Sequence, residues 1–177
     1  AGAPPRAAAS APSISRPRPS SRSLAMKSSK LHSTPFALLG VTSRDDRRKI
    51  VDQAEHKSLE LNPDDCQMAR SDLTNPRNRL TAEIAWLPGV SPRRASQLLE
   101  GLAVDAMAVR GETGLPTLAH CNLLAAAFEA VPSSYPPEDL AEFIQELAVL
   151  VDDLDADEVI RDINEDRSIS GFPEVKG

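Results

Sequence analysis

Residues 34–87 carry a close series of helix start and stop signals, which constrain the fold more than any other feature of the chain. Thr34 is suited to cap a helix whose first position is Pro35, because its hydroxyl accepts from a free backbone N–H and proline has none to lose. Gly40 is suited to end that helix, since it tolerates the left-handed conformation found at many helix ends. The folded part of the chain is therefore expected to begin with a short helix over residues 35–40.

A second helix is expected over residues 45–61, with Asp45 and Asp46 in its first turn, where negative charge is favoured. Asn62-Pro63 should break it, because the residue before a proline avoids the helical region. One arc of this helix gathers the side chains that should face the core, which are Ile50, Val51, Ala54, Ser58 and Leu61.

Two shorter helices complete this stretch. The third is expected over residues 66–73, and the fourth begins at Asn75-Pro76. At helical spacing they present Cys66, Ala69 and Leu73, and then Leu80, Ile84 and Leu87.

In order and spacing, these motifs resemble the J-domain of heat-shock co-chaperones. The matching residues are Phe36, Leu39, Gly40 and Val41, then Asn62-Pro63-Asp64, and then Leu73-Thr74-Asn75-Pro76 with Arg77 and Arg79. In that family the second helix ends in His-Pro-Asp, and its histidine stimulates a partner ATPase of the seventy-kilodalton chaperone class. The resemblance implies a helical hairpin and a chaperone-binding set on its first arm, for which the candidates are Arg47, Arg48, Lys49 and Lys57.

Asn62 takes the place of the family's histidine, and an amide cannot titrate as an imidazole does. Ala54 stands where the family has a large aromatic residue, which thins the core between the paired helices. The candidate basic residues are diluted by Asp52, Glu55 and Glu60. We therefore expect a non-enzymatic J-domain-like co-chaperone or protein-interaction adaptor that does not stimulate a chaperone ATPase in the usual way.

The remainder of the chain predicts an acidic helical domain over residues 91–168, followed by a loop or a cut end over residues 169–177. Ser91 is suited to cap a helix that starts at Pro92, and residues 117–131 are apolar nearly all round, as in a central helix. A further helix follows Pro136-Pro137, with an apolar stripe of Leu140, Phe143, Ile144, Leu147, Leu150 and Val151. The predicted fold class is all-α, with a J-domain-like helical hairpin in residues 34–87 followed by this small helical domain.

Charge divides the chain unevenly. Residues 1–30 contain six basic residues and no acid, whereas the rest contains 14 basic and 26 acidic residues. The basic Ser/Pro/Arg-rich tail is expected to be disordered, and is either an organelle transit peptide or an upstream region with Met26 as the true start. We expect a cytoplasmic protein, or an organellar one if the transit interpretation holds.

The acidic body makes nucleic acid an unfavourable partner, because phosphates repel it. The alternative function, a helical nucleic-acid-associated protein, would use a local basic patch of Arg44, Arg47, Arg48, Lys49, Arg93 and Arg94. Residues 138–166 contain twelve acids and one base, which indicates either a solvated surface or a docking face for a basic partner.

No nucleophile–base set, phosphate loop or cofactor motif stands out, so no catalytic residue and no cofactor are predicted. His120 and Cys121 are adjacent, but no second pair with metal-ligand spacing exists among the three histidines and two cysteines. Cys66 and Cys121 are expected to be buried as small apolar side chains, with a single disulfide as the alternative. No apolar run approaches the ~20 residues that cross a bilayer, so no membrane association is expected.

Overall fold

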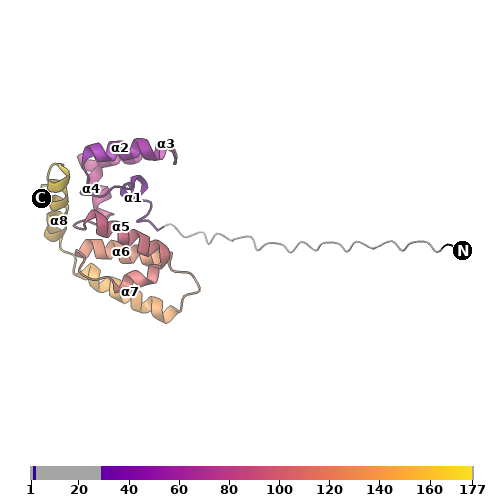
Figure 1. Ribbon diagram of the computed structural model, residues 1–177. Helices are drawn as coiled ribbons and strands as arrows, with labels where there is room; N and C mark the ends of the chain where they lie inside the picture. Colours follow the sequence, from indigo (N-terminus) through magenta and orange to yellow (C-terminus); the bar gives the residue numbers. More distant parts are fainter. Residues whose placement is uncertain (1, 3–28, 177) are drawn as a thin grey trace.

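The computed structural model describes residue 2 and residues 29–176 (Figure 1). Within these residues the chain forms eight α-helices, one 3-10 helix and no strand, which confirms the all-α prediction. The predicted disorder of the amino-terminal tail falls largely on residues 3–28, which lie outside the described residues. The elements are α1 (Pro35–Leu39), α2 (Arg47–Lys57), α3 (Pro63–Thr74), α4 (Pro76–Ile84), α5 (Pro92–Val104), η1 (Ala106–Gly111), α6 (Thr117–Ala130), α7 (Pro137–Asp152) and α8 (Ala156–Ser170).

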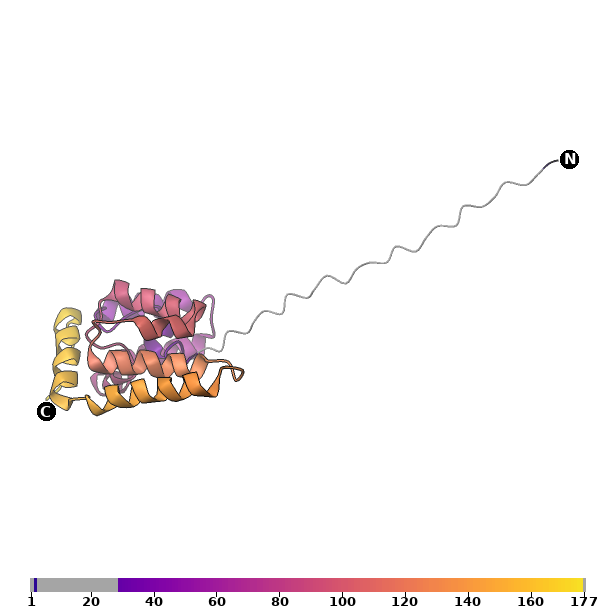
Figure 2. The same ribbon diagram turned by 90° about the horizontal axis from the view of Figure 1, so that it is seen from below.

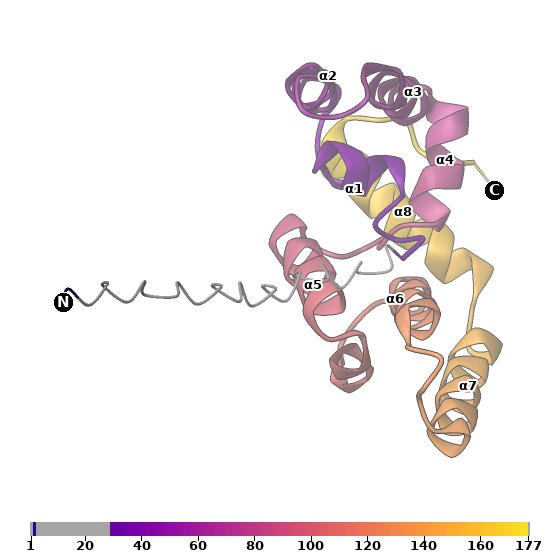
Figure 3. The same ribbon diagram turned by 90° about the vertical axis from the view of Figure 1, so that its right-hand side faces the viewer.

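Helices α2 and α3 form an antiparallel hairpin that packs on α1 (Figure 3). The short first helix begins and ends as its sequence predicts: the Thr34 hydroxyl oxygen accepts from the Ala37 N–H at 3.3 Å, and Gly40 has a φ of 66°. The interior of this unit is made of apolar side chains from α1, α2 and α3, among them Phe36, Leu39, Ile50 and Leu73. These side chains fix the hairpin over α1.

The second helix is shorter than predicted at both ends. Asp45 and Asp46 precede it rather than lying in its first turn: Asp46 is the N-cap and accepts from the Lys49 N–H at 2.8 Å, while Asp45 accepts from the Thr42 N–H at 2.7 Å. These carboxylates satisfy backbone donors before the helix starts. The helix ends at Lys57, so the predicted core residue Leu61 lies in the following turn and is 42% exposed.

Helices α5, α6 and α7 with η1 form the second part of the molecule, on the other side of α1 from the hairpin (Figure 3). The predicted central helix is confirmed, since α6 buries side chains on several faces, namely Ala119, Cys121, Leu123, Leu124, Ala126 and Ala127. It packs on α7 through an edge-to-face pair of Phe128 and Phe143, with ring centroids 5.6 Å apart.

The two parts share one hydrophobic core, which runs across the predicted boundary at residues 87–91. Trp86 is 1% exposed and its ring lies 5.4 Å from that of Phe36 in α1. Leu87 and Val90 are also buried, and the Asn122 amide of α6 donates to the Trp86 carbonyl at 2.6 Å. The link between α4 and α5 is therefore part of the interior.

Helix α8 stands at one end of the molecule, across the ends of the helices in the second part (Figure 2). Although the sequence groups it with residues 91–168, its polar contacts reach back to the first part. These contacts are described with the buried charges below.

Among the described residues, no helix is both long enough and apolar enough to cross a membrane.

Candidate functional site

The Asn62-Pro63-Asp64 motif lies at the tip of the α2–α3 hairpin, and all three residues are exposed. Asn62 is the N-cap of α3, and its side-chain oxygen accepts from the Asp64 N–H at 2.9 Å. Just before the motif, Leu59 is 83% exposed and Leu61 is 42% exposed. We call residues 59–64 the hairpin tip; it combines a rigid helix start with two apolar side chains in solvent.

The four candidate basic residues do not gather at this tip. Arg47 lies at the opposite end of α2, where its guanidinium donates to the Thr74 carbonyl at 2.8 Å. Arg48 and Lys49 follow it at the same end, and Lys49 pairs with Asp45 at 2.9 Å. Consecutive helical residues point about 100° apart, so these three side chains do not share one face.

Lys57 is the one candidate near the tip, where it is half-buried and pairs with Glu60 at 3.9 Å. The exposed side chains around it are mainly acidic, namely Glu55, Glu60, Asp64 and Asp65. The tip is therefore negative in balance, whereas the resemblance implies a positive contact surface.

A groove of about 270 Å³ lies beside the tip, between α2 and α3. Its floor includes Ala54 and Cys66, two small buried side chains where the helices face each other. Its rim carries Glu55, Asp64 and Arg70. The groove lies where the small side chain of Ala54 leaves the helix-pairing core thin.

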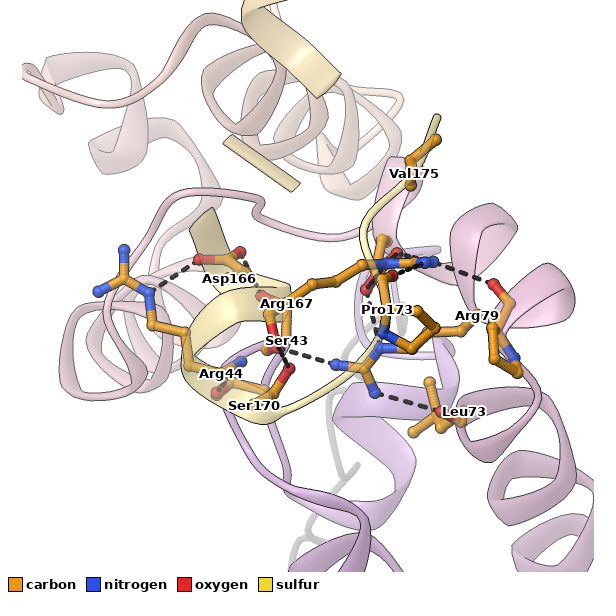
Figure 4. Close-up of polar contacts among 12 residues, drawn as sticks. Ser43, Arg44, Leu73, Arg79, Asp166, Arg167, Ser170, Pro173 and Val175 are labelled. Carbon is orange, nitrogen blue, oxygen red and sulfur yellow. Dashed lines mark hydrogen bonds and ion pairs between the residues drawn. The ribbon is translucent and has the colours of Figure 1, made fainter. Parts of the chain in front are cut away.

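Charged side chains from α4 and α8 form a buried ionic cluster (Figure 4). On α4 the predicted apolar face of Leu80, Ile84 and Leu87 is only partly correct, because Ile84 is 45% exposed. The interior instead receives Arg79 and Glu83, whose side chains are 0% and 1% exposed, and Arg79 Nε donates to Glu83 Oε1 at 2.8 Å.

Each terminal guanidinium nitrogen of Arg79 donates to a backbone carbonyl. Its guanidinium donates to the Ser43 carbonyl at 2.8 Å and to the Leu73 carbonyl at 3.2 Å (Figure 4). The Phe172 ring, after α8, lies 3.8 Å from the guanidinium carbon, and burial lowers the pKa of Arg79 against the opposing effect of Glu83. Arg79 thereby joins α4, the loop before α2 and the carboxyl-terminal segment.

Arg167 of α8 shares the Glu83 carboxylate. Its guanidinium donates to both Glu83 oxygens, with the shortest contact at 2.8 Å, and to the Pro76 and Pro173 carbonyls at 3.0 and 2.8 Å. Both oxygens of Glu83 are thus engaged by arginine N–H groups. The shared carboxylate makes the cluster a joint between α4 and α8.

Asp166 forms the second half of this joint and is 0% exposed. Its carboxylate accepts from the Ser43 hydroxyl at 2.7 Å, from Arg44 Nε at 2.8 Å and from the Gly89 N–H at 2.9 Å. The α8 helix therefore holds both the loop before α2 and the link before α5. We call Arg79, Glu83, Asp166 and Arg167 the buried ionic cluster.

The residues after α8 are tied back to the fold. Gly171 ends the helix with a φ of 80°, and Asn164 exchanges hydrogen bonds with the Val175 backbone at 2.7 and 3.1 Å. The predicted loop over residues 169–177 is thus helical at its start and docked beyond it.

Cys66 and Cys121 are both buried and free, which confirms their predicted role as small apolar side chains. Burial raises the pKa of Cys121 and lowers that of His120. In the part of the chain that the structure describes, no three His, Cys, Asp or Glu side chains come together as a metal site would require.

Comparisons with protein-family models, with curated proteins and with solved structures found no significant match for this chain.

Proposed function

We propose that this protein is a non-enzymatic protein-interaction adaptor whose α2–α3 hairpin tip contacts a partner protein. The observation that carries the proposal is the exposure of Leu59 and Leu61 beside the exposed Asn62-Pro63-Asp64 motif. Large apolar side chains displayed at a helix junction favour binding, because covering them releases water.

The partner class that the sequence resemblance favours is a heat-shock ATPase of the seventy-kilodalton class. Asn62 supplies a helix cap but no imidazole, so contact without stimulation of ATP hydrolysis is expected. The acids around Lys57 weaken attraction to a negative chaperone surface, since like charges slow encounter and lower affinity. The proposed contact is therefore weak and chiefly apolar.

The test measures binding of the full chain to a purified chaperone ATPase by biolayer interferometry, together with single-turnover ATP hydrolysis. A variant with Leu59→Ser and Leu61→Ser should lose at least tenfold in affinity. The matched control carries Val104→Ser and Ile169→Ser, which replace side chains 87% and 54% exposed elsewhere, and should bind as the unchanged protein does.

Hydrolysis should stay at its basal rate with the unchanged protein and with Asn62→His. Stimulation by the unchanged protein would contradict the proposal that the motif has lost its coupling function. Equal loss of binding in the tip variant and the control would show that the hairpin tip is not the contact.

A further inference from the structure

Helix α7 carries an apolar stripe on its outer face. The stripe consists of Ala141, Ile144, Ala148 and Val151, all exposed, and Ile144 and Val151 keep 53% and 49% of their surface in solvent. Half-buried Leu140 and Leu147 adjoin it and lead into the core. The stripe thus extends the hydrophobic core to the surface along one helix.

The contact of α7 with the rest of the fold does not use this stripe. Phe143 is 0% exposed and packs against Phe128 of α6, and Arg110 covers the Phe143 ring at 4.9 Å while pairing with Glu146. In Figure 3, α7 lies at the edge of the molecule, with α6 on one side only. The outer stripe remains open to solvent.

The spacing of the residues in the stripe indicates the secondary structure of a segment that could bind there. Its members follow each other at intervals of three, four and three residues, which is the a/d pattern of a coiled-coil seam. At 1.5 Å per residue the stripe is about 15 Å long. A second helix lying along α7 would bury it.

The charges beside the stripe indicate the sign of the partner. Its exposed flank carries Glu138, Glu142 and Asp152, and α7 contains no lysine or arginine. A second copy of α7 would bring the same acids together, and like charges across an interface oppose association. A helix rich in lysine or arginine would pair with them.

We propose that the outer face of α7 docks a basic amphipathic helix from a partner protein. This surface is separate from the hairpin tip and lies on the other part of the molecule. The occupant presents leucine or isoleucine to Ile144 and Val151, and positive side chains to Glu138, Glu142 and Asp152.

The experiment titrates the full chain into a fluorescent 21-residue helical peptide of three heptads, with leucine at positions a and d and lysine at e and g. The matched peptide has glutamate in place of lysine. We expect at least tenfold tighter binding of the lysine peptide by fluorescence anisotropy, and weaker binding as salt is raised.

Ile144→Ser with Val151→Ser should reduce affinity for the lysine peptide at least tenfold. The control, Leu59→Ser with Leu61→Ser, removes the same number of exposed apolar side chains from the hairpin tip and should change it less than twofold. Because this control disables the proposed chaperone contact, the two proposals succeed or fail independently.

Equal binding of the two peptides, or equal losses in the two variants, would overturn the proposal. So would self-association of the chain that Ile144→Ser with Val151→Ser abolishes, since the occupant would then be a second copy. Displacement of the lysine peptide by a synthetic peptide of residues 1–28, which is basic and free of acids, would assign the surface to this chain itself.

Discussion

On α4 the charged side chains Arg79 and Glu83 face the interior, whereas on α7 the large apolar side chains Ile144 and Val151 face solvent. Each helix thus departs in part from the usual distribution of polar and apolar residues. The difference lies in what surrounds them: α8 supplies Arg167 to bond the buried Glu83 of α4, while no described segment covers the outer stripe of α7. The apolar pattern of a single helix predicts that a helix forms, but the neighbouring helices decide which of its faces is buried.

The largest loss of stability is expected for Glu83→Gln. The change keeps the shape of the side chain but leaves two buried guanidinium groups without their shared carboxylate. We expect the free energy of unfolding to fall by about 3–5 kcal/mol, measured by urea denaturation followed by circular dichroism. Glu142→Gln on exposed α7 is the control, and a loss below about 1 kcal/mol for Glu83→Gln would show that the cluster does not hold α8.

Asp166→Asn tests the other half of the joint. The amide cannot accept all three hydrogen bonds from Ser43, Arg44 and Gly89 as the carboxylate does, and hydrogen bonds to charged groups are worth about 1.5–3 kcal/mol. We expect a loss of about 2–3 kcal/mol. Glu165→Gln on the adjacent residue is the control, because the Glu165 carboxylate is 60% exposed and comes no closer than 3.9 Å to Arg44. Equal losses in the two variants would contradict the role of Asp166 in holding α8.

Gly89→Ala probes the backbone that Asp166 binds. Gly89 has a φ of 77°, and an added Cβ would lie 2.9 Å from the Pro116 side chain. Gly114 has a φ of 71° but nothing within 4 Å of such a Cβ. Gly114→Ala should therefore cost only the left-handed strain of about 1 kcal/mol, and Gly89→Ala about 2 kcal/mol. Similar melting temperatures for the two variants would mean that the backbone of the link before α5 shifts at little cost to accommodate the added Cβ.

The smallest effect is expected on α7. Ile144→Ser with Val151→Ser should change the free energy of unfolding by no more than about 1 kcal/mol per site, because about half of each side chain already lies in solvent. Phe143→Ala on the inner face should cost about 3–5 kcal/mol and sets the scale. A large loss of unfolding free energy in the serine variant would mean that the stripe stabilises the fold rather than forming a free binding surface.

Local signals predicted several helix starts, although the third helix begins at Pro63 rather than at the predicted residue 66. Thr34, Asn75 and Ser91 each cap the helix that the sequence places after them, because a cap needs only its next two or three residues. The prediction that Asp45 and Asp46 lie inside the second helix is wrong, because their carboxylates accept hydrogen bonds from backbone N–H groups just before and at its start.

The buried ionic cluster could not be found in this way. Arg79 and Glu83 are four residues apart on a helix, which is the spacing of an ordinary surface ion pair. Distant groups make the pair an interior one, namely Arg167, Phe172 and the Ser43 carbonyl, and sequence gives no distance between them and α4. The scatter of Arg47, Arg48 and Lys49 was predictable, since three consecutive helical residues cannot share a face.

The position of Arg167 also bears on the order in which the chain folds. Glu83 and Arg167 are 84 residues apart, so at about 5–20 residues per second the ribosome releases Glu83 roughly 4–17 s before its second arginine. Until then, turning Arg79 and Glu83 inward leaves the Oε2 atom of Glu83 without its arginine donor, and Phe172 does not yet cover Arg79. The region from α1 to α4 therefore completes its buried polar contacts only after α8 and the segment that follows it have been synthesised.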